Sequence, residues 1–316
     1  TVELLDLEPA AIEHIDRLLF DQTRGQLAFR AARDLLGLDE RPCEAILLVE
    51  FFDDDGARAD EVAHRRLGLR TLLCRDPREQ ELVWEVRRAG LSLLTGRPGP
   101  AKPATCVEDV CVRPERLPEY VRGLREILGP LGLEASFYGH AASGELHVRP
   151  TLDLHTAEGV ALLRRVADEV SDLTRRFGGS LAAEHGVGIT RTEYLPAHLG
   201  PRLLDATIEV KRLFDPAGLL NPGKIVDTGR WRIDRDLRLG EAPSLELPLA
   251  PLYGYVDKDR SFVGNLEQCN GNGACLKAAP TMCPTFRATG DELESTRGRA
   301  NAIGAALAGA FGGDPV

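Results

Sequence analysis

The chain has 316 residues, and its 49 acidic side chains outnumber its 39 lysines and arginines, which gives a formal net charge of −10. This acidic balance disfavours nucleic-acid binding, which usually needs a basic face. No apolar run approaches the roughly 18 residues of a membrane span and the first residues carry no secretion signal, so we expect a cytoplasmic protein without a transmembrane segment.

Apolar periodicity predicts that helices alternate with short strands in the first part of the chain. The predicted helices are Ala10–Phe20, Arg24–Leu36, Asp60–Leu67 and Glu79–Leu94. The predicted strands are a buried segment, Glu44–Phe52, followed by Arg70–Cys74 and Thr105–Val112.

The second part of the chain combines helices with one hairpin. The predicted helices are Pro114–Leu128, Ala157–Phe177 and Pro201–Phe214, and the hairpin strands are Glu134–His140 and Gly144–Arg149. Strands joined by helices or tight turns favour an α+β fold, with a mostly antiparallel sheet and helices on one face. No glycine-rich phosphate loop follows a predicted strand, so the chain alone is not expected to hold a dinucleotide.

The chain turns irregular between Asp227 and Lys258, where proline and glycine recur. We interpret this stretch as a linker. We therefore predict a domain over residues 1–227, a linker over 228–258 and a small, partly helical segment over 259–316. The chain begins with Thr1, and we interpret both of its ends as cut from a longer protein.

Four residues form a candidate metal and acid–base set. His140 and His147 stand at the two ends of the hairpin turn, and Glu184 and His185 follow in a glycine-rich loop. Two neutral imidazoles and a carboxylate suit a divalent ion such as zinc, and the remaining histidine could take a proton from a hydroxyl polarised by the metal. A lone histidine is more often structural. That is the role we assign to the other histidines, His14, His64, His155 and His198.

Three motifs carry a family resemblance. They are YGHAASGELHVRP over Tyr138–Pro150, GGSLAAEHGVGITR over Gly178–Arg191 and KRLFDPAGLLNPGKI over Lys211–Ile225. In this order they resemble the cap domain of the FAD-linked 2-hydroxy acid dehydrogenases, the family of D-lactate and D-2-hydroxyglutarate dehydrogenases. The resemblance covers most of Val2–Asp227.

The resemblance implies a cap fold and oxidation of a small D-2-hydroxy acid to the 2-oxo acid, with FAD bound mostly by an upstream domain. It implies that His140, His147 and Glu184 bind the metal and that His185 is the catalytic base. The turn departs from the family pattern. Where the family often has Asp-Gly-Asn, this chain has Ser-Gly-Glu over Ser143–Glu145, so the substrate contacts of that amide are in question.

Further roles follow from the same resemblance. Arg87 and Lys102 match positions that bind the substrate carboxylate, a task that suits the planar fork of arginine. A solvated helix face explains Arg87 equally well. Asn221 and Lys224, in the NPGK turn, match positions near the flavin. The pair Glu108–Asp109 also fits the family, and we interpret it as structural.

Three cysteines lie close together in the pattern C-x5-C-x7-C-P: Cys269, Cys275 and Cys283. Thiolates on glycine-rich loops can hold an iron–sulfur cluster, although this spacing differs from the common ferredoxin motif and incidental cysteines are the alternative. Zinc fits less well, because a structural site wants four ligands. The segment Cys269–Ala300 resembles the start of the iron–sulfur module of large bacterial FAD dehydrogenases, which implies a [4Fe–4S] cluster. Its fourth ligand would come from a later motif, so we expect the cluster to be incomplete here.

The resulting hypothesis is a fragment of a flavin-dependent dehydrogenase, inactive by itself. Electrons would pass from a small 2-hydroxy acid through FAD to iron–sulfur clusters and an unidentified acceptor. A homo-oligomer is compatible with the sequence, and any membrane contact would come through the acceptor. Two alternatives remain, a non-redox metallohydrolase on the same His/His/Glu set and a non-catalytic scaffold whose histidines are structural.

Overall fold

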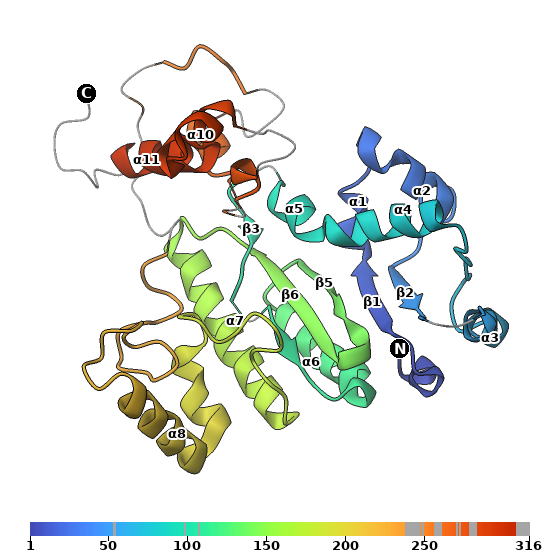
Figure 1. Cartoon of the computed structure of the whole chain (residues 1–316), viewed down its shortest axis with the longest axis horizontal. Helices are drawn as coiled ribbons and strands as arrows, with labels where there is room; N and C mark the ends of the chain where they lie inside the picture. The colour runs from blue at the N-terminus through green and yellow to red at the C-terminus, as the bar shows by residue number, and fades with distance from the viewer. Residues whose placement is uncertain are drawn as a thin grey trace.

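The computed structural model describes residues 1–52, 55–97, 99–106, 108–237, 247, 250–255, 261–269, 271, 273–277 and 283–307. Its strands are β1 (Ala11–Asp16), β2 (Ala45–Glu50), β3 (Lys102–Pro103), β4 (Val110–Cys111), β5 (Ala135–His140) and β6 (Glu145–Leu152). They form one sheet of order β2-β1-β5-β6-β3, with β4 also paired to β6 (Figure 1). Every pairing among the described residues is antiparallel, which confirms the predicted α+β sheet with flanking helices.

The helices pack around this sheet (Figure 1). They are α1 (Arg17–Asp21), α2 (Arg30–Leu36), α3 (Ala57–Arg65), α4 (Pro77–Arg88), α5 (Gly90–Thr95), α6 (Leu117–Leu128), α7 (Ala157–Arg176), α8 (Leu195–Phe214), α9 (Phe262–Leu266), α10 (Pro284–Thr289) and α11 (Thr296–Leu307). Short 3-10 turns lie at Val2–Leu7, Leu27–Phe29, Pro114–Arg116, Ala141–Ser143, Thr192–Tyr194, Ala274–Leu276 and Glu292–Glu294. Among the described residues, no helix combines the length and the apolarity that crossing a membrane would need.

The main core lies between the sheet and the helices α6 and α7. Thr156 caps α7 by accepting a hydrogen bond of 3.0 Å from the Gly159 amide. Val166 and Val170, on one side of α7, are fully buried against the apolar side chains of β6, such as Val148. Burying this stripe stabilises the fold by removing apolar surface from water.

A second core lies on the opposite face of the sheet. Ile15 of β1 and Tyr138 of β5 pack there with Val86 of α4 and Leu94 of α5. The sheet is therefore covered by helices on both faces, whereas the sequence predicted helices on one face. The second layer was missed because α4 carries many charged side chains, which are typical of a solvated helix face.

The predicted helix Ala10–Phe20 is wrong, because the structure has β1 followed by the short helix α1. Its apolar residues fit a helical spacing, but β1 pairs with β2 along one edge and with β5 along the other. Asp16 ends the strand and caps α1, accepting a hydrogen bond of 3.0 Å from the Leu19 amide. Pairing on both edges outweighs the local helix preference.

Other boundaries also change. Arg70–Cys74 is not a strand, and the predicted helix Glu79–Leu94 is divided at Ala89 into α4 and α5. The predicted strand Glu44–Phe52 contains β2, but as an edge strand without a fully buried residue. Among the described residues of the predicted strand Thr105–Val112, only Val110–Cys111 forms a strand of the sheet. Isolated apolar runs of this length do not distinguish a strand from an extended loop.

The predicted helix Arg24–Leu36 is shortened, because α2 begins at Arg30 after the 3-10 turn Leu27–Phe29. Other elements agree with the sequence more closely. The hairpin and α6 and α7 form as predicted, and Gly200, with φ 70°, divides α8 so that its second part begins at Pro201. The predicted linker and the end of the last segment fall partly outside the described residues, so the three-segment division stays a prediction. The last segment contains α9, α10 and α11.

Candidate active site

One face of the sheet carries a row of polar side chains. Glu13 of β1 lies directly opposite His140 of β5, and Tyr138 of β5 lies directly opposite His147 of β6. Directly paired residues share a face, and side chains alternate along a strand, so residues two positions away share it too. We call this set the polar face: Glu13, Tyr138, His140, Glu145, His147 and Arg149.

The four predicted site residues meet at the Glu184 carboxylate. Its Oε2 lies 3.3 Å from Nε2 of His140, and its Oε1 lies 3.2 Å from Nε2 of both His147 and His185. The hairpin supplies two of these imidazoles, and the loop after α7 supplies Glu184 and His185. The structure therefore brings together the three predicted metal ligands and the predicted base.

The donor atoms suit a divalent metal. Ligand atoms of His140, Glu145, His147 and Glu184 all lie within 4.8 Å of one another. Imidazole nitrogens together with carboxylate oxygens are ligands that zinc and similar ions accept. A second group within the same limit is Asp109, His147, Glu184 and His185, so His185 could itself become a ligand.

Two histidines, His147 and His185, face Oε1 of Glu184, and His185 is the more exposed of the two. Its ring stacks on the ring of His147, with the centroids 5.0 Å apart and the planes 3° from parallel. The side chain of His185 is 41% exposed, whereas that of His147 is 6% exposed. A substrate can therefore reach His185 more readily than His147.

A buried carboxylate lies behind each hairpin histidine. Oε1 of Glu13 lies 2.6 Å from Nδ1 of His140, and Oε1 of Glu145 lies 2.8 Å from Nδ1 of His147. Nδ1 of His140 is hydrogen-bonded to Glu13, and Nδ1 of His147 is hydrogen-bonded to the Glu108 carbonyl oxygen at 3.1 Å. Such Nδ1 contacts leave Nε2 free to bind a metal. Glu145, which replaces an amide of the family pattern, thus contacts a histidine. It also accepts a hydrogen bond of 2.9 Å from the His140 amide.

Electrostatics link these groups further. Partial burial disfavours the charged form of His140, but the hydrogen bond and charge of Glu13, with the charges of Glu145 and Glu184, outweigh it and raise the pKa of His140. Burial alone would raise the pKa of Glu145, but hydrogen bonds from His147 and the His140 amide lower it. The carboxylates therefore favour charged or metal-bound partners around Glu184.

Asp109 holds the loop that carries Glu184 and His185. It is completely buried, and its carboxylate accepts backbone hydrogen bonds from Ala183 at 3.1 Å, from Glu184 at 3.1 Å and from His185 at 2.9 Å. This contact supports the structural role predicted for the pair Glu108–Asp109. It also explains how a loop can keep two functional side chains in place.

Glu108 anchors the same loop from its other end. Its Oε1 accepts a hydrogen bond of 2.8 Å from the buried Arg191, which also donates to the Gly186 carbonyl at 2.6 Å. Burial by itself would raise the pKa of Glu108, but the charges of Arg191 and Arg149 lower it. Its Oε1 also lies 3.6 Å from Nδ1 of His185, so Glu108 helps to orient that ring.

Of the two predicted carboxylate-binding residues, the structure brings only Arg87 to the cluster. Nε of Arg87 lies 2.8 Å from Oε2 of Glu13, the residue behind His140. Lys102 pairs with Leu152, five residues beyond His147 on β6, which is about 16 Å along a strand. Its Nζ donates to the Arg97 carbonyl at 2.5 Å.

The NPGK turn docks on the segment that follows the His185 loop. The Ile225 amide donates a hydrogen bond of 2.9 Å to Oγ1 of the buried Thr192, and that hydroxyl donates to the Gly188 carbonyl at 2.7 Å. Asn221 has a φ of 46°, and Oδ1 of Asn221 accepts a hydrogen bond of 3.0 Å from Nζ of Lys224. The flavin contacts implied for Asn221 and Lys224 stay a prediction.

The three clustered cysteines lie in the last segment. Cys275 lies in a 3-10 turn, Cys269 follows α9, and Cys283 precedes α10. Hydrogen bonds from Thr285 and from the Phe286 amide lower the pKa of Cys283 to about 6, which favours the ligand form of the thiol. Within the described residues, no group of three ligand atoms closer than 4.8 Å includes a cysteine, so the cluster stays a prediction.

Sequence reasoning missed the roles of Glu13 and Arg149, and it gave Asp109 a structural role without identifying the loop that Asp109 holds. Glu13 lies in the segment that was predicted as a helix, which hid its place opposite His140. Arg149 alternates with Val148 in the strand after His147, and that period of two was the available signal. The three backbone contacts of Asp109 depend on tertiary structure and leave no local signal.

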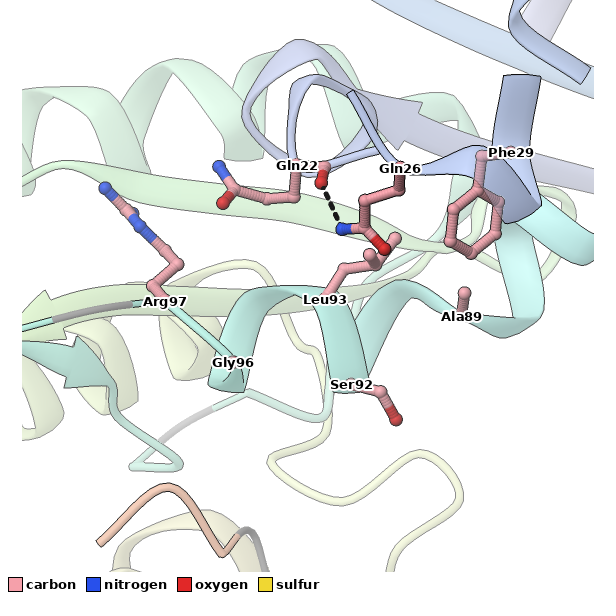
Figure 2. A pocket seen from close by; sticks show the side chains of 8 residues that line it. All are labelled: Gln22, Gln26, Phe29, Ala89, Ser92, Leu93, Gly96 and Arg97. Atoms are coloured by element: carbon pink, nitrogen blue, oxygen red, sulfur yellow. Dashed lines mark hydrogen bonds between the residues drawn. The ribbon is translucent and has the colours of Figure 1, made fainter. Parts of the chain in front are cut away.

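A separate surface hollow of about 540 Å³ lies between the turn after α1 and the helix α5 (Figure 2). Its lining residues are Gln22, Gln26, Phe29, Ala89, Ser92, Leu93, Gly96 and Arg97. On one side, Nε2 of Gln26 donates to the Gln22 carbonyl at 2.7 Å (Figure 2). The hollow includes none of the predicted site residues, and we assign it no role.

Several known proteins are similar to this chain in sequence. The chain is similar to D-2-hydroxyglutarate dehydrogenase of Escherichia coli, with 30% identity over 321 residues, which is 95% of this chain and 30% of that protein. It is 33% identical over 323 residues to the enzyme of the same name from Pseudomonas putida, covering 94% of this chain and 30% of that protein. A glycolate oxidase subunit of Bacillus subtilis is 26% identical over 221 residues, covering 69% of this chain and 45% of that subunit.

The chain thus spans 30% of the length of the first two relatives. Residues 3–225, which include the sheet, the histidines and the NPGK turn, match the family model described as FAD linked oxidases, C-terminal domain. The chain therefore belongs to the family of FAD linked oxidase C-terminal domains.

Proposed function

We propose that this chain is the substrate-facing part of an FAD-dependent dehydrogenase that oxidises a small D-2-hydroxy acid to the 2-oxo acid. The observation that carries the proposal is the convergence of three histidine Nε2 atoms on Glu184, within 3.3 Å. The names of the relatives, D-2-hydroxyglutarate and D-lactate dehydrogenase, support the substrate class.

His140, His147 and Glu184 are the residues that would hold a divalent metal, with zinc as our choice. When bound, the metal would supply a positive charge that polarises the substrate hydroxyl and lowers its pKa. Glu13 and Glu145 keep the two imidazoles oriented for this task through their Nδ1 contacts.

His185 would take the proton of the substrate hydroxyl at Nε2. Its exposure gives the substrate access, and Glu108 near Nδ1 orients the ring. Arg87, beside Glu13, would bind the carboxylate next to the reacting carbon through its Nη atoms. Positioning and proton removal are the contributions of this chain, since hydride acceptance belongs to FAD when it is bound.

The electron path beyond FAD belongs to the same proposal. Cys269, Cys275 and Cys283 would hold part of a [4Fe–4S] cluster, supported by the lowered pKa of Cys283. Asn221 and Lys224 would lie near the flavin. Lys102 remains the second proposed carboxylate-binding residue, although it lies away from the histidines in this chain. Iron and sulfide analysis of the purified protein tests the cluster.

A histidine variant tests the catalytic assignment in the flavin-loaded protein. His185→Ala should keep its metal and flavin but slow flavin bleaching by a D-2-hydroxy acid about 10²- to 10⁴-fold, the usual contribution of a general base. His198→Ala is the matched control, because His198 contacts Ser171 on α7 away from Glu184. Rapid mixing without oxygen measures the bleaching rate.

Other results would assign a different role to His185 or to the whole chain. Bleaching at the parent rate shows that His185 is not the base. Loss of metal in His185→Ala shows that His185 is a ligand. A protein that holds metal and hydrolyses test esters without flavin would instead be a metallohydrolase, and a protein that binds neither metal nor substrate would be a scaffold.

A further inference from the structure

Arg149 is a buried cation with an incomplete set of partners. The residue is 4% exposed, and its Nε donates a hydrogen bond of 2.7 Å to the Tyr138 hydroxyl. Its Nη1 is buried and has no hydrogen-bond partner among the described residues. A buried charged donor without a partner is costly, so such an atom in a functional region indicates a missing ligand.

The position of Arg149 relates it to the metal cluster. It lies two residues after His147 on the same face of β6. Two residues of a strand span about 7 Å along the backbone. The charge of Arg149 also acts on Glu108, whose carboxylate lies 3.6 Å from His185. The unpartnered nitrogen is therefore within the reach of a small molecule held at the histidines.

Two guanidinium groups flank the same aromatic ring. Cζ of Arg87 lies 5.4 Å from the centroid of the Tyr138 ring, and Cζ of Arg149 lies 5.7 Å from it. Arg87 is tied to Glu13 at Nε and lies beside His140. The polar face thus offers two separate cationic forks around one reaction centre, more than a monocarboxylate needs.

We propose that Arg149 binds the second carboxylate of a 2-hydroxydicarboxylate substrate, while Arg87 binds the carboxylate next to the hydroxyl. This assignment rests on the proposed function and adds the substrate class to it. A guanidinium fork matches a carboxylate in two parallel hydrogen bonds, and burial strengthens such bonds because water does not compete.

The same contact selects against shorter acids. A monocarboxylate such as lactate leaves the buried Arg149 nitrogen unpaired, and sites with unpaired buried polar groups reject such analogues strongly. The protein should therefore prefer a dicarboxylate in kcat/KM. An ordered water on Nη1 is the competing explanation, and it predicts no such preference.

The test compares two substrates and two variants in the flavin-loaded protein. Arg149→Met removes the charge, and Arg149→Lys keeps it without the fork. With D-2-hydroxyglutarate, kcat/KM should fall on the order of 10²- to 10³-fold in Arg149→Met and less in Arg149→Lys. With D-lactate, kcat/KM should change little in either variant. The fall should appear mainly in KM, because Arg149 does not touch the reacting atoms.

Arg33→Lys is the matched control, since Arg33 is another buried arginine but pairs with Asp39 and Thr23 outside the polar face. It should affect both substrates equally. Protection of the protein from thermal unfolding by the non-reacting dicarboxylate glutarate supplies a readout without turnover, and Arg149→Met should abolish it. Equal losses for both substrates, or unchanged protection by glutarate, would overturn the role of Arg149. A parent protein that oxidises neither acid would instead refute the proposed function.

Discussion

At the scale of single residues, the site depends on what lies behind its histidines. His140 and His147 each face Glu184 with Nε2 and a buried carboxylate with Nδ1. A proton on Nδ1, hydrogen-bonded to Glu13 in His140 and to the Glu108 carbonyl in His147, leaves the Nε2 lone pair directed at the centre of the cluster. Glu13 has a second contact in the site, because it also pairs with Arg87.

Replacing Glu13 with Gln should therefore weaken metal binding without removing any metal ligand. The amide of Gln can direct its NH2 group toward Nδ1 of His140, and the charge that favours the metal complex is lost. We expect the zinc affinity, measured by competition with a chelator, to fall roughly 10- to 100-fold. Glu13→Asp, which keeps the charge on a shorter side chain, should lose less.

Glu134→Gln is the matched control. Glu134 pairs with Arg97 at 2.7 Å, and the side chain of Glu134 is 52% exposed. The zinc affinity of the Glu134→Gln protein should therefore equal that of the parent. Equal zinc affinity in Glu13→Gln and the parent would show that Glu13 does not position His140.

At the scale of the elements, the hairpin turn brings the two metal histidines together. Gly144 ends the short turn after β5 with φ 74°, a conformation that favours glycine. A Cβ at this position would lie 1.8 Å from the Val112 carbonyl oxygen, which belongs to the backbone and has little freedom to move. The turn therefore permits only glycine for two independent reasons.

Gly144→Ala should destabilise the fold and disturb the site together. The left-handed conformation alone costs on the order of 1 kcal/mol, and the clash adds to it. Gly178→Ala provides the comparison, because Gly178 has φ 64° but open space around its would-be Cβ. We expect Gly144→Ala to lower the free energy of unfolding, measured with urea, more than Gly178→Ala does. Only Gly144→Ala should also lower the zinc affinity. Equal effects of the two substitutions would mean that the contact with Val112 is unimportant.

Some elements could be predicted because their signals are local. The periodicity of α7 and its Thr156 cap lie within one stretch of sequence, as does the small-residue turn of the hairpin. The segment Ala10–Phe20 could not be predicted in this way. Its apolar spacing fits a helix, and only pairing with β2 on one edge and with β5, more than a hundred residues later, on the other makes it a strand.

The site residues also differ in whether their signals are local in the sequence. His140, His147, Glu184 and His185 were predicted because their residue types and glycine-rich surroundings are visible in the sequence. The contact between Glu13 and His140 joins residues separated by 127 positions, so no local pattern contains it. Lys102 shows the opposite difficulty, since a position taken from a resemblance did not reach the histidines in this chain.

At the scale of the whole molecule, one histidine connects the sheet domain to the last segment. Nδ1 of His155, just after β6, lies 2.7 Å from Oδ1 of Asp153, and its Nε2 lies 3.1 Å from Oε1 of Glu267, which follows α9. The ring thus lies between two carboxylates from different parts of the chain. Protonated His155 can donate to both, whereas neutral His155 can donate to only one.

This contact should make the attachment of the last segment depend on pH. Partial burial lowers the pKa of His155, but hydrogen bonds to Asp153 and Glu267 and their charges raise it above its ordinary value of 6.5. A pKa raised by folding means that the stabilisation is complete below pH 6.5 and is lost as the pH rises through the folded value. His155→Gln should therefore lower the unfolding temperature at acidic pH and have little effect in alkaline solution. The other histidines titrate in both proteins, so their effect cancels in the difference between the unfolding temperatures of the variant and the parent. His64→Gln, which alters an exposed histidine on α3, controls for the loss of an imidazole. A difference that does not vary with pH would show that the bridge to Glu267 does not form in solution.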